Sequence, residues 1–187
     1  MKIKTTKEKR IFIIKTALRW FLYLVLIFIC FLIMCSGTHL KPILLIPATI
    51  CISANTGELQ SAAVGILCGF LIDISCNKLF GYNAVLLCIF CVAVSLLYSN
   101  LLRNKFINSF VVTSVVSFIH GLLDFNFYYD IWGYEDSGLI FRNYTVPVWI
   151  MTIISSVVIY GIITFINKLL MPKPHLSIEE AIKNFEE

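Results

Sequence analysis

Long apolar runs separated by short polar segments dominate the hydrophobic pattern of this chain. Six runs are nearly free of charge, and they cover residues 17–36, 42–54, 59–76, 79–102, 106–123 and 146–167. A helix needs about 20 apolar residues to cross a hydrocarbon core of about 30 Å. The second run is short for a span, but it can still cross if the bilayer thins locally. The pattern therefore predicts an all-α integral membrane protein with six transmembrane helices.

The distribution of charge predicts the orientation of these helices. Seven Lys and Arg residues precede Trp20, against one acid, Glu8. By the positive-inside rule, residues 1–16 are expected to be a basic cytoplasmic N-terminus. Six spans then place Arg103 and Lys105 inside and the acidic loop of residues 124–144 outside. Residues 171–187 become a cytoplasmic tail, and the aromatic side chains of the 124–144 loop are expected to lie on the outer headgroups.

Composition excludes several classes of protein. Hydrophobic residues make up 59% of the chain and charged residues only 14%. A soluble domain of this size could not bury so much apolar surface. The N-terminal charges have no aromatic interleaving, so a nucleic-acid partner is not expected. A cleaved signal peptide is the alternative interpretation of residues 20–34. A retained first helix is favoured because further membrane segments follow at once. The expected location is a membrane, with both termini cytoplasmic.

A stripe of small residues marks the third run. Ala62, Gly65, Gly69 and Asp73 recur at three- and four-residue steps, which places them on one helix face. Small residues four apart let another backbone approach closely in lipid. We expect this stripe, with Gly81 and Asn83 of the following junction, to be a helix-packing or partner interface.

Ionisable residues within the membrane runs form a second candidate feature. Asp73 lies near the outer end of the third run, and the fifth run brings His120 and Asp124 to the same depth on one face. Such groups normally face protein and find partners. One hypothesis is a polar cluster of Asp73, His120 and Asp124 that binds a ligand or relays a proton. The other is a structural pairing of Asp73 with His120 or Lys78.

The sequence offers little support for catalysis or for a metal site. Cys88 and Cys91 have CxxC spacing, but no second such pair and no histidine cluster completes a zinc site. Cysteines in apolar runs are better explained by packing. No nucleophile elbow and no HExxH motif occur. We therefore expect no catalytic residues, no metal and no cofactor.

The central stretch resembles a known family. Its pattern comprises Pro42 and Pro47 in the second run, Gly57, Gly65, Gly69, Phe70 and Asp73 around the third, and the junction Phe80-Gly81-Tyr82-Asn83-Ala84. This order and spacing is similar to that of MreD, the bacterial rod shape-determining membrane protein. The resemblance covers roughly residues 40–124 by motif and the rest by architecture. Lys78 and the aromatic loop are not part of the pattern.

The resemblance implies a non-enzymatic scaffold of the cell-wall elongation machinery. Its partners would be an MreC-like single-span protein, cytoplasmic MreB filaments, the RodA glycosyltransferase and a class B penicillin-binding protein. The implied fold resembles the substrate-binding subunits of energy-coupling-factor vitamin transporters, so such a subunit is the alternative function. Against it, the first helix lacks the small-residue face with which those subunits dock. Similarity of fold alone would not show that the chain has a transport function.

Overall fold

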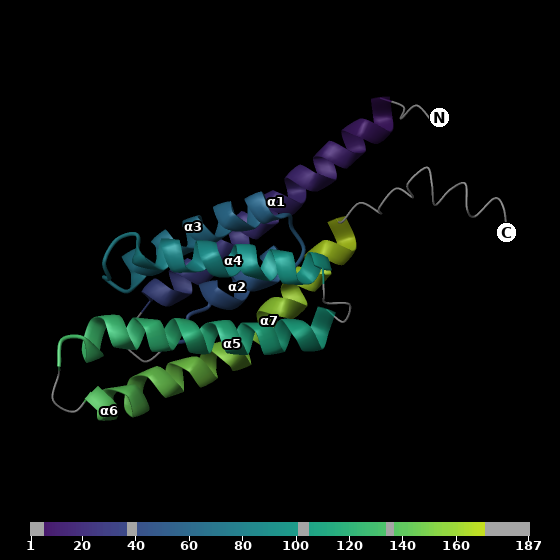
Figure 1. Ribbon diagram of the computed structural model, residues 1–187. Coiled ribbons are helices and arrows are strands. Elements are labelled where there is room, and N and C mark those ends of the chain that lie inside the picture. The colour runs from purple at the N-terminus through teal and green to yellow at the C-terminus, as the bar shows by residue number, and fades with distance from the viewer. Residues whose placement is uncertain (1–5, 37–40, 101–104, 134–136, 171–187) are drawn as a thin grey trace.

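The computed structural model describes residues 6–36, 41–100, 105–133 and 137–170, and within these ranges it contains helices and no strand (Figure 1). In chain order the elements are α1 (Thr6–Cys35), α2 (Leu45–Ser53), α3 (Glu58–Ser75), α4 (Tyr82–Asn100), α5 (Lys105–Phe125), η1 (Asn126–Asp130), α6 (Ser137–Ile140), η2 (Phe141–Thr145) and α7 (Val146–Leu170). Five stretches within the described ranges are long and apolar enough to cross a membrane: Arg10–Cys35, Glu58–Ser75, Tyr82–Ser99, Asn108–Asp130 and Gly138–Leu170. The chain is thus an all-α, multi-pass membrane protein.

The second run, which the sequence predicts to be a short span, is the one that is not among these five stretches. Its helix, α2, has only nine residues, and every one of them is buried by the rest of the protein. At about 1.5 Å per residue it rises about 13 Å, less than half the thickness of a hydrocarbon core. Residues 41–43, which precede it, are not helical. Residues 41–43 are half-buried, and irregular backbone within a membrane protein is tolerated where protein covers it.

The chain nevertheless runs back and forth between two ends of the bundle. Figure 1 shows α3 joining α4 at one end, which we call the hairpin end, and α4 approaching α5 at the other. The first residues of α1 and the last residues of α7 both lie at the end opposite the hairpin end (Figure 1). The short α2, with its flanking residues, therefore returns the chain from the end of α1 to the start of α3.

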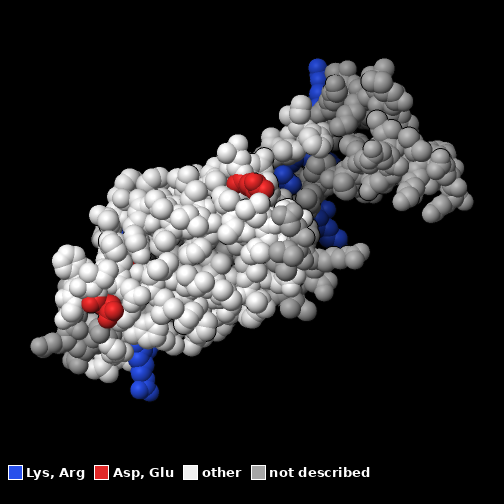
Figure 2. Space-filling view, in the orientation of Figure 1, with Lys and Arg blue, Asp and Glu red and all other residues white. Residues whose placement is uncertain are grey.

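The interior is built around α2. Its buried residues pack with one face of α1 and with inward positions of the other long helices, including Cys68, Leu87, Val94 and Ile163. The outward faces expose large apolar side chains such as Phe21, Phe28 and Phe165, as lipid-facing surfaces do. On the face drawn in Figure 2, charged residues lie toward the two ends, with an uncharged surface between them.

The predicted boundaries shift at both ends of the membrane domain. The first helix begins at Thr6, so part of the predicted basic N-terminus is helical. Most of the described part of the predicted 124–144 loop is helical too: η1 continues α5 to Asp130, while α6 and η2 lead into α7. The predicted spans were too short at these limits, because charged residues also occupy helix ends. Arg103 and the tail of residues 171–187 lie outside the described residues.

Candidate functional site

The two glycines of the small-residue stripe lie in the seam between α3 and α4. A Cβ atom added at Gly65 would lie 2.7 Å from the carbonyl oxygen of Leu87, and one added at Gly69 would lie 2.3 Å from the Cα of Ala84. Both distances are too short for real contacts, so only glycine permits this approach. The stripe therefore packs against α4 of the same chain. At these glycines the stripe is a helix-packing surface, the first of the two expected roles, and it is not free to bind another protein.

Asp73, at the end of the same stripe, forms hydrogen bonds that stabilise the junction between the two helices. Its Oδ2 accepts a hydrogen bond from the backbone N–H of Gly81 at 2.8 Å. Its Oδ1 accepts bonds from the backbone N–H of Asn83 at 3.2 Å and from the Asn83 side-chain Nδ2 at 2.7 Å. Gly81 adopts a φ of 98°, a left-handed conformation that favours glycine. Three donors thus satisfy a carboxylate that is almost fully buried.

Asn83 links this junction to α5. Its Oδ1 lies 2.6 Å from His120 Nε2, and both side chains are completely buried. Since Asn83 Nδ2 donates to Asp73, the amide is oriented with its oxygen toward the imidazole. His120 Nε2 must therefore donate, and His120 Nδ1, in the neutral ring, is an acceptor. Asp73 and His120 do meet in one polar chain, but through Asn83 and not directly.

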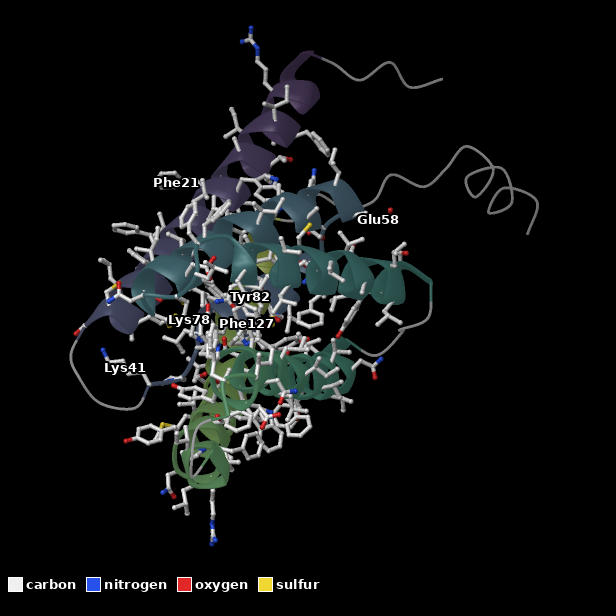
Figure 3. The ribbon with its side chains drawn as sticks, turned by 60° about the vertical axis from the view of Figure 1, so that its left-hand side comes forward. Phe21, Lys41, Glu58, Lys78, Tyr82 and Phe127 are labelled. Carbon is white, nitrogen blue, oxygen red and sulfur yellow. The ribbon has the colours of Figure 1, made fainter. Side chains whose placement is uncertain are left out.

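The third predicted member of the cluster has a different partner. Asp124 forms an ion pair with Lys78, and both side chains are about one-fifth exposed. The Lys78 ammonium also lies 5.5 Å from the ring centroid of Tyr128. Figure 3 shows Lys78 near Tyr82 and Phe127, whose rings stack 4.6 Å apart. The predicted cluster is therefore two units, the chain Asp73–Asn83–His120 and the pair Lys78–Asp124.

A cavity of about 470 Å³ opens beside both units at the hairpin end. Its wall is formed mainly by α5 and η1, by η2 and the start of α7, and by the two segments that precede α2 and follow α3. The wall includes the charged, polar and aromatic side chains of Lys41, Lys78, Ser117, His120, Asp124, Tyr128, Tyr144 and Trp149. Three buried polar atoms of these residues have no hydrogen-bond partner: Ser117 Oγ, His120 Nδ1 and Asp124 Oδ1.

The described residues contain no group of three His, Cys, Asp or Glu side chains that could hold a metal ion. Cys88 and Cys91 are both free thiols, and Cys91 is buried. Within the described part of the chain, the ionisable residues predicted as a cluster lie around the α3–α4 junction and the cavity.

Sequence reasoning missed two features of this region. Asn83 was expected only as a packing residue, yet it joins the carboxylate to the imidazole. A lone amide opening an uncharged helix, ten residues after a membrane-embedded acid, is the signal that could have revealed it. The cavity had no such signal, because segments far apart in the sequence form its wall.

Comparisons with protein-family models, with curated proteins and with solved structures gave no match to this chain. What the protein does is therefore inferred from its own residues.

Proposed function

We propose that this chain is a non-enzymatic membrane scaffold of the MreD type, acting in bacterial cell-wall elongation and rod-shape determination. In this role it binds an MreC-like single-span protein in the plasma membrane. Through that partner it is linked to MreB filaments, to RodA and to a class B penicillin-binding protein.

The observation that supports the proposal most is the convergence of the MreD-like pattern on one structural unit. Gly65 and Gly69 allow α3 and α4 to touch, Asp73 fastens the junction, Gly81 supplies its turn, and Asn83 connects it to α5. These residues are close in sequence, but each of them makes a specific contact that holds the hairpin together. The resemblance therefore rests on residues that depend on one another physically.

The state of Asp73 favours a structural role over a catalytic one. Both of its oxygens already accept hydrogen bonds from the junction, and its side chain is buried. A general acid or base needs a free oxygen within reach of a substrate proton. A carboxylate that is saturated by its own backbone is better suited to holding two helices in place.

Charge at the two ends favours the orientation expected of such a scaffold. Arg10, Lys15 and Arg19 of α1 and Lys168 of α7 lie toward the end opposite the hairpin, where Glu58 is the acid at the start of α3. An excess of Lys and Arg marks the cytoplasmic side. In this orientation the hairpin end and its cavity face outward.

One observation favours the alternative, a substrate-binding transport subunit. A cavity of about 470 Å³ lies in the size range of small-molecule sites. The two functions demand different partners: an MreC-like protein for the scaffold and a pair of ATPase subunits for the transporter.

The test is co-expression of the tagged full chain with each partner set from the same genome, followed by purification in mild detergent. The scaffold proposal expects a stable complex with the MreC-like protein and no tight vitamin binding by the purified chain. A complex with the ATPase pair, together with nanomolar affinity for a vitamin, would replace it with the transport function.

A further inference from the structure

The cavity at the hairpin end has an inner wall built from one face of α5. Ser117, His120 and Asp124 follow one another at three- and four-residue steps, so their side chains share that face. Ser117 is 5% exposed and His120 is fully buried. Each of the three carries a buried polar atom without a partner, which is costly unless something bonds to it.

The hydrogen-bonding character of this inner wall can be deduced from the Asp73–Asn83–His120 chain. Asp73 only accepts, which orients the Asn83 amide, and this in turn makes His120 Nε2 a donor. His120 Nδ1 is therefore a lone-pair acceptor. Asp124 Oδ1 is an acceptor as well, because its carboxylate is ionised in the pair with Lys78. Two of the three unpartnered atoms thus require donors, and the Ser117 hydroxyl accepts either kind of partner.

Another part of the wall is aromatic and includes Tyr128, Tyr144 and Trp149. Two of these side chains form hydrogen bonds with backbone groups. Trp149 Nε1 donates to the Ser114 carbonyl at 3.2 Å, and the Tyr128 hydroxyl accepts from the Leu79 N–H at 2.9 Å. The rings of these side chains give the cavity an apolar surface, which suits a flat apolar body.

We propose that this cavity binds a small flat ring compound that presents at least two N–H or O–H donors along one edge. The donor edge meets His120 Nδ1, Asp124 Oδ1 and Ser117 Oγ, and the ring lies among the aromatic side chains. Lys41 and Lys78 also line the cavity, so an anion such as a phosphate group is the competing occupant. The inner wall disfavours it, because a phosphate that only accepts would face two acceptors. The inference does not depend on the scaffold function, and it can fail while the scaffold proposal stands.

The probes are 2-aminoquinazoline, which carries an amino group with two N–H donors, and quinazoline, which has the same ring system and no donor. The full chain is placed in nanodiscs of phosphatidylethanolamine and phosphatidylglycerol and titrated by calorimetry, with empty nanodiscs as the blank. We expect saturable binding of the amino compound, about tenfold tighter than quinazoline, since two further hydrogen bonds form. Inorganic phosphate should not displace it.

Two variants on one face of α5 distinguish a specific binding site from a general effect of removing a buried hydroxyl. Ser117→Ala removes a hydroxyl of the cavity wall and should weaken binding of 2-aminoquinazoline about three- to tenfold, leaving quinazoline unchanged. Thr113→Ala removes an equally buried and unpartnered hydroxyl, one turn away and outside the cavity, and should change neither affinity. Neither hydroxyl has a partner to lose, so both variants should fold.

Several results would overturn the proposal. Equal affinity for the two probes, or equal loss in the two variants, would show that the inner wall does not select donors. Displacement by phosphate, or a phospholipid bound stoichiometrically in native mass spectrometry, would assign the cavity to an anionic group. No saturable binding above the blank would mean that the cavity is merely hydrated.

Discussion

The Oδ1 atom of Asn83 accepts a hydrogen bond from His120 Nε2 over 2.6 Å, and this contact joins the start of α4 to the C-terminal part of α5. Because the other end of the same amide donates to Asp73, a single side chain ties three helices together. Both partners are buried, so neither can turn to water if Asn83 is lost.

Replacement of Asn83 should therefore destabilise the protein strongly. Asn83→Ala leaves the Asp73 carboxylate with one donor fewer and His120 without its partner, at a cost of about 2 kcal/mol or more. Asn83→Asp should be worse, because it places a second carboxylate against Asp73. The measurement is the midpoint of SDS-induced unfolding in bicelles, with the exposed Asn126→Ala as control. An Asn83→Asp protein as stable as wild type would refute this hydrogen-bond chain.

The close contact between α3 and α4 can be tested by comparing alanine substitutions at two helical glycines, one inside this contact and one outside it. Gly69→Ala drives a methyl group into the Ala84 backbone and should cost about 3 kcal/mol, because backbone cannot move aside as a flexible side chain does. Gly161→Ala meets nothing within 4 Å and should be neutral or stabilising by up to about 1 kcal/mol. Unfolding midpoints of the two variants check this directly. Equal midpoints would mean that α3 and α4 are not in close contact.

The ion pair between Lys78 and Asp124 is open to a double-mutant cycle. Both side chains are about one-fifth exposed, so the coupling should be about 1–2 kcal/mol, between the values for surface and buried pairs. The variants are Lys78→Met, Asp124→Asn and the combination of both, compared at low and high salt. A coupling near zero would show that the two charges act independently.

The orientation of the bundle can be tested with an impermeant maleimide. In a cysteine-free background that still folds, Ile131→Cys at the hairpin end should be labelled from outside intact cells, and Arg10→Cys should be labelled only after permeabilisation. Both side chains are exposed, so accessibility alone does not decide the result. Labelling of Arg10→Cys from outside would invert the proposed topology.

The sequence predicted the long helices because runs of apolar residues report burial in lipid directly. It could not distinguish α2 from a span, since Leu45–Ser53 is equally apolar whether lipid or protein covers it. It also could not tell an internal seam from a partner surface. Gly65 and Gly69 would look the same in both, because close backbone approach needs small residues whichever chain supplies the second helix.

For the candidate site, residue spacing predicted correctly which ionisable residues lie near one another, but it did not predict their hydrogen-bond and ion-pair partners. Asp73, His120 and Asp124 do lie in one region, as helix periodicity indicated. Their partners depend on the path of the junction between α3 and α4, where a positive φ at Gly81 directs the backbone toward Asp73. Helical periodicity does not describe such a turn, so the roles of Asn83 and Lys78 could be seen only in the three-dimensional structure.

The proposed scaffold role in wall elongation can be tested by depleting the protein in its native cells and imaging cell shape together with the sites of wall synthesis. We expect rods to become round and the MreC-like partner to lose its pattern along the cell wall. Expression of wild type or of Gly161→Ala should restore both. Depleted cells that keep their rod shape and wall pattern but lose uptake of a vitamin would refute the scaffold role and assign the protein to transport.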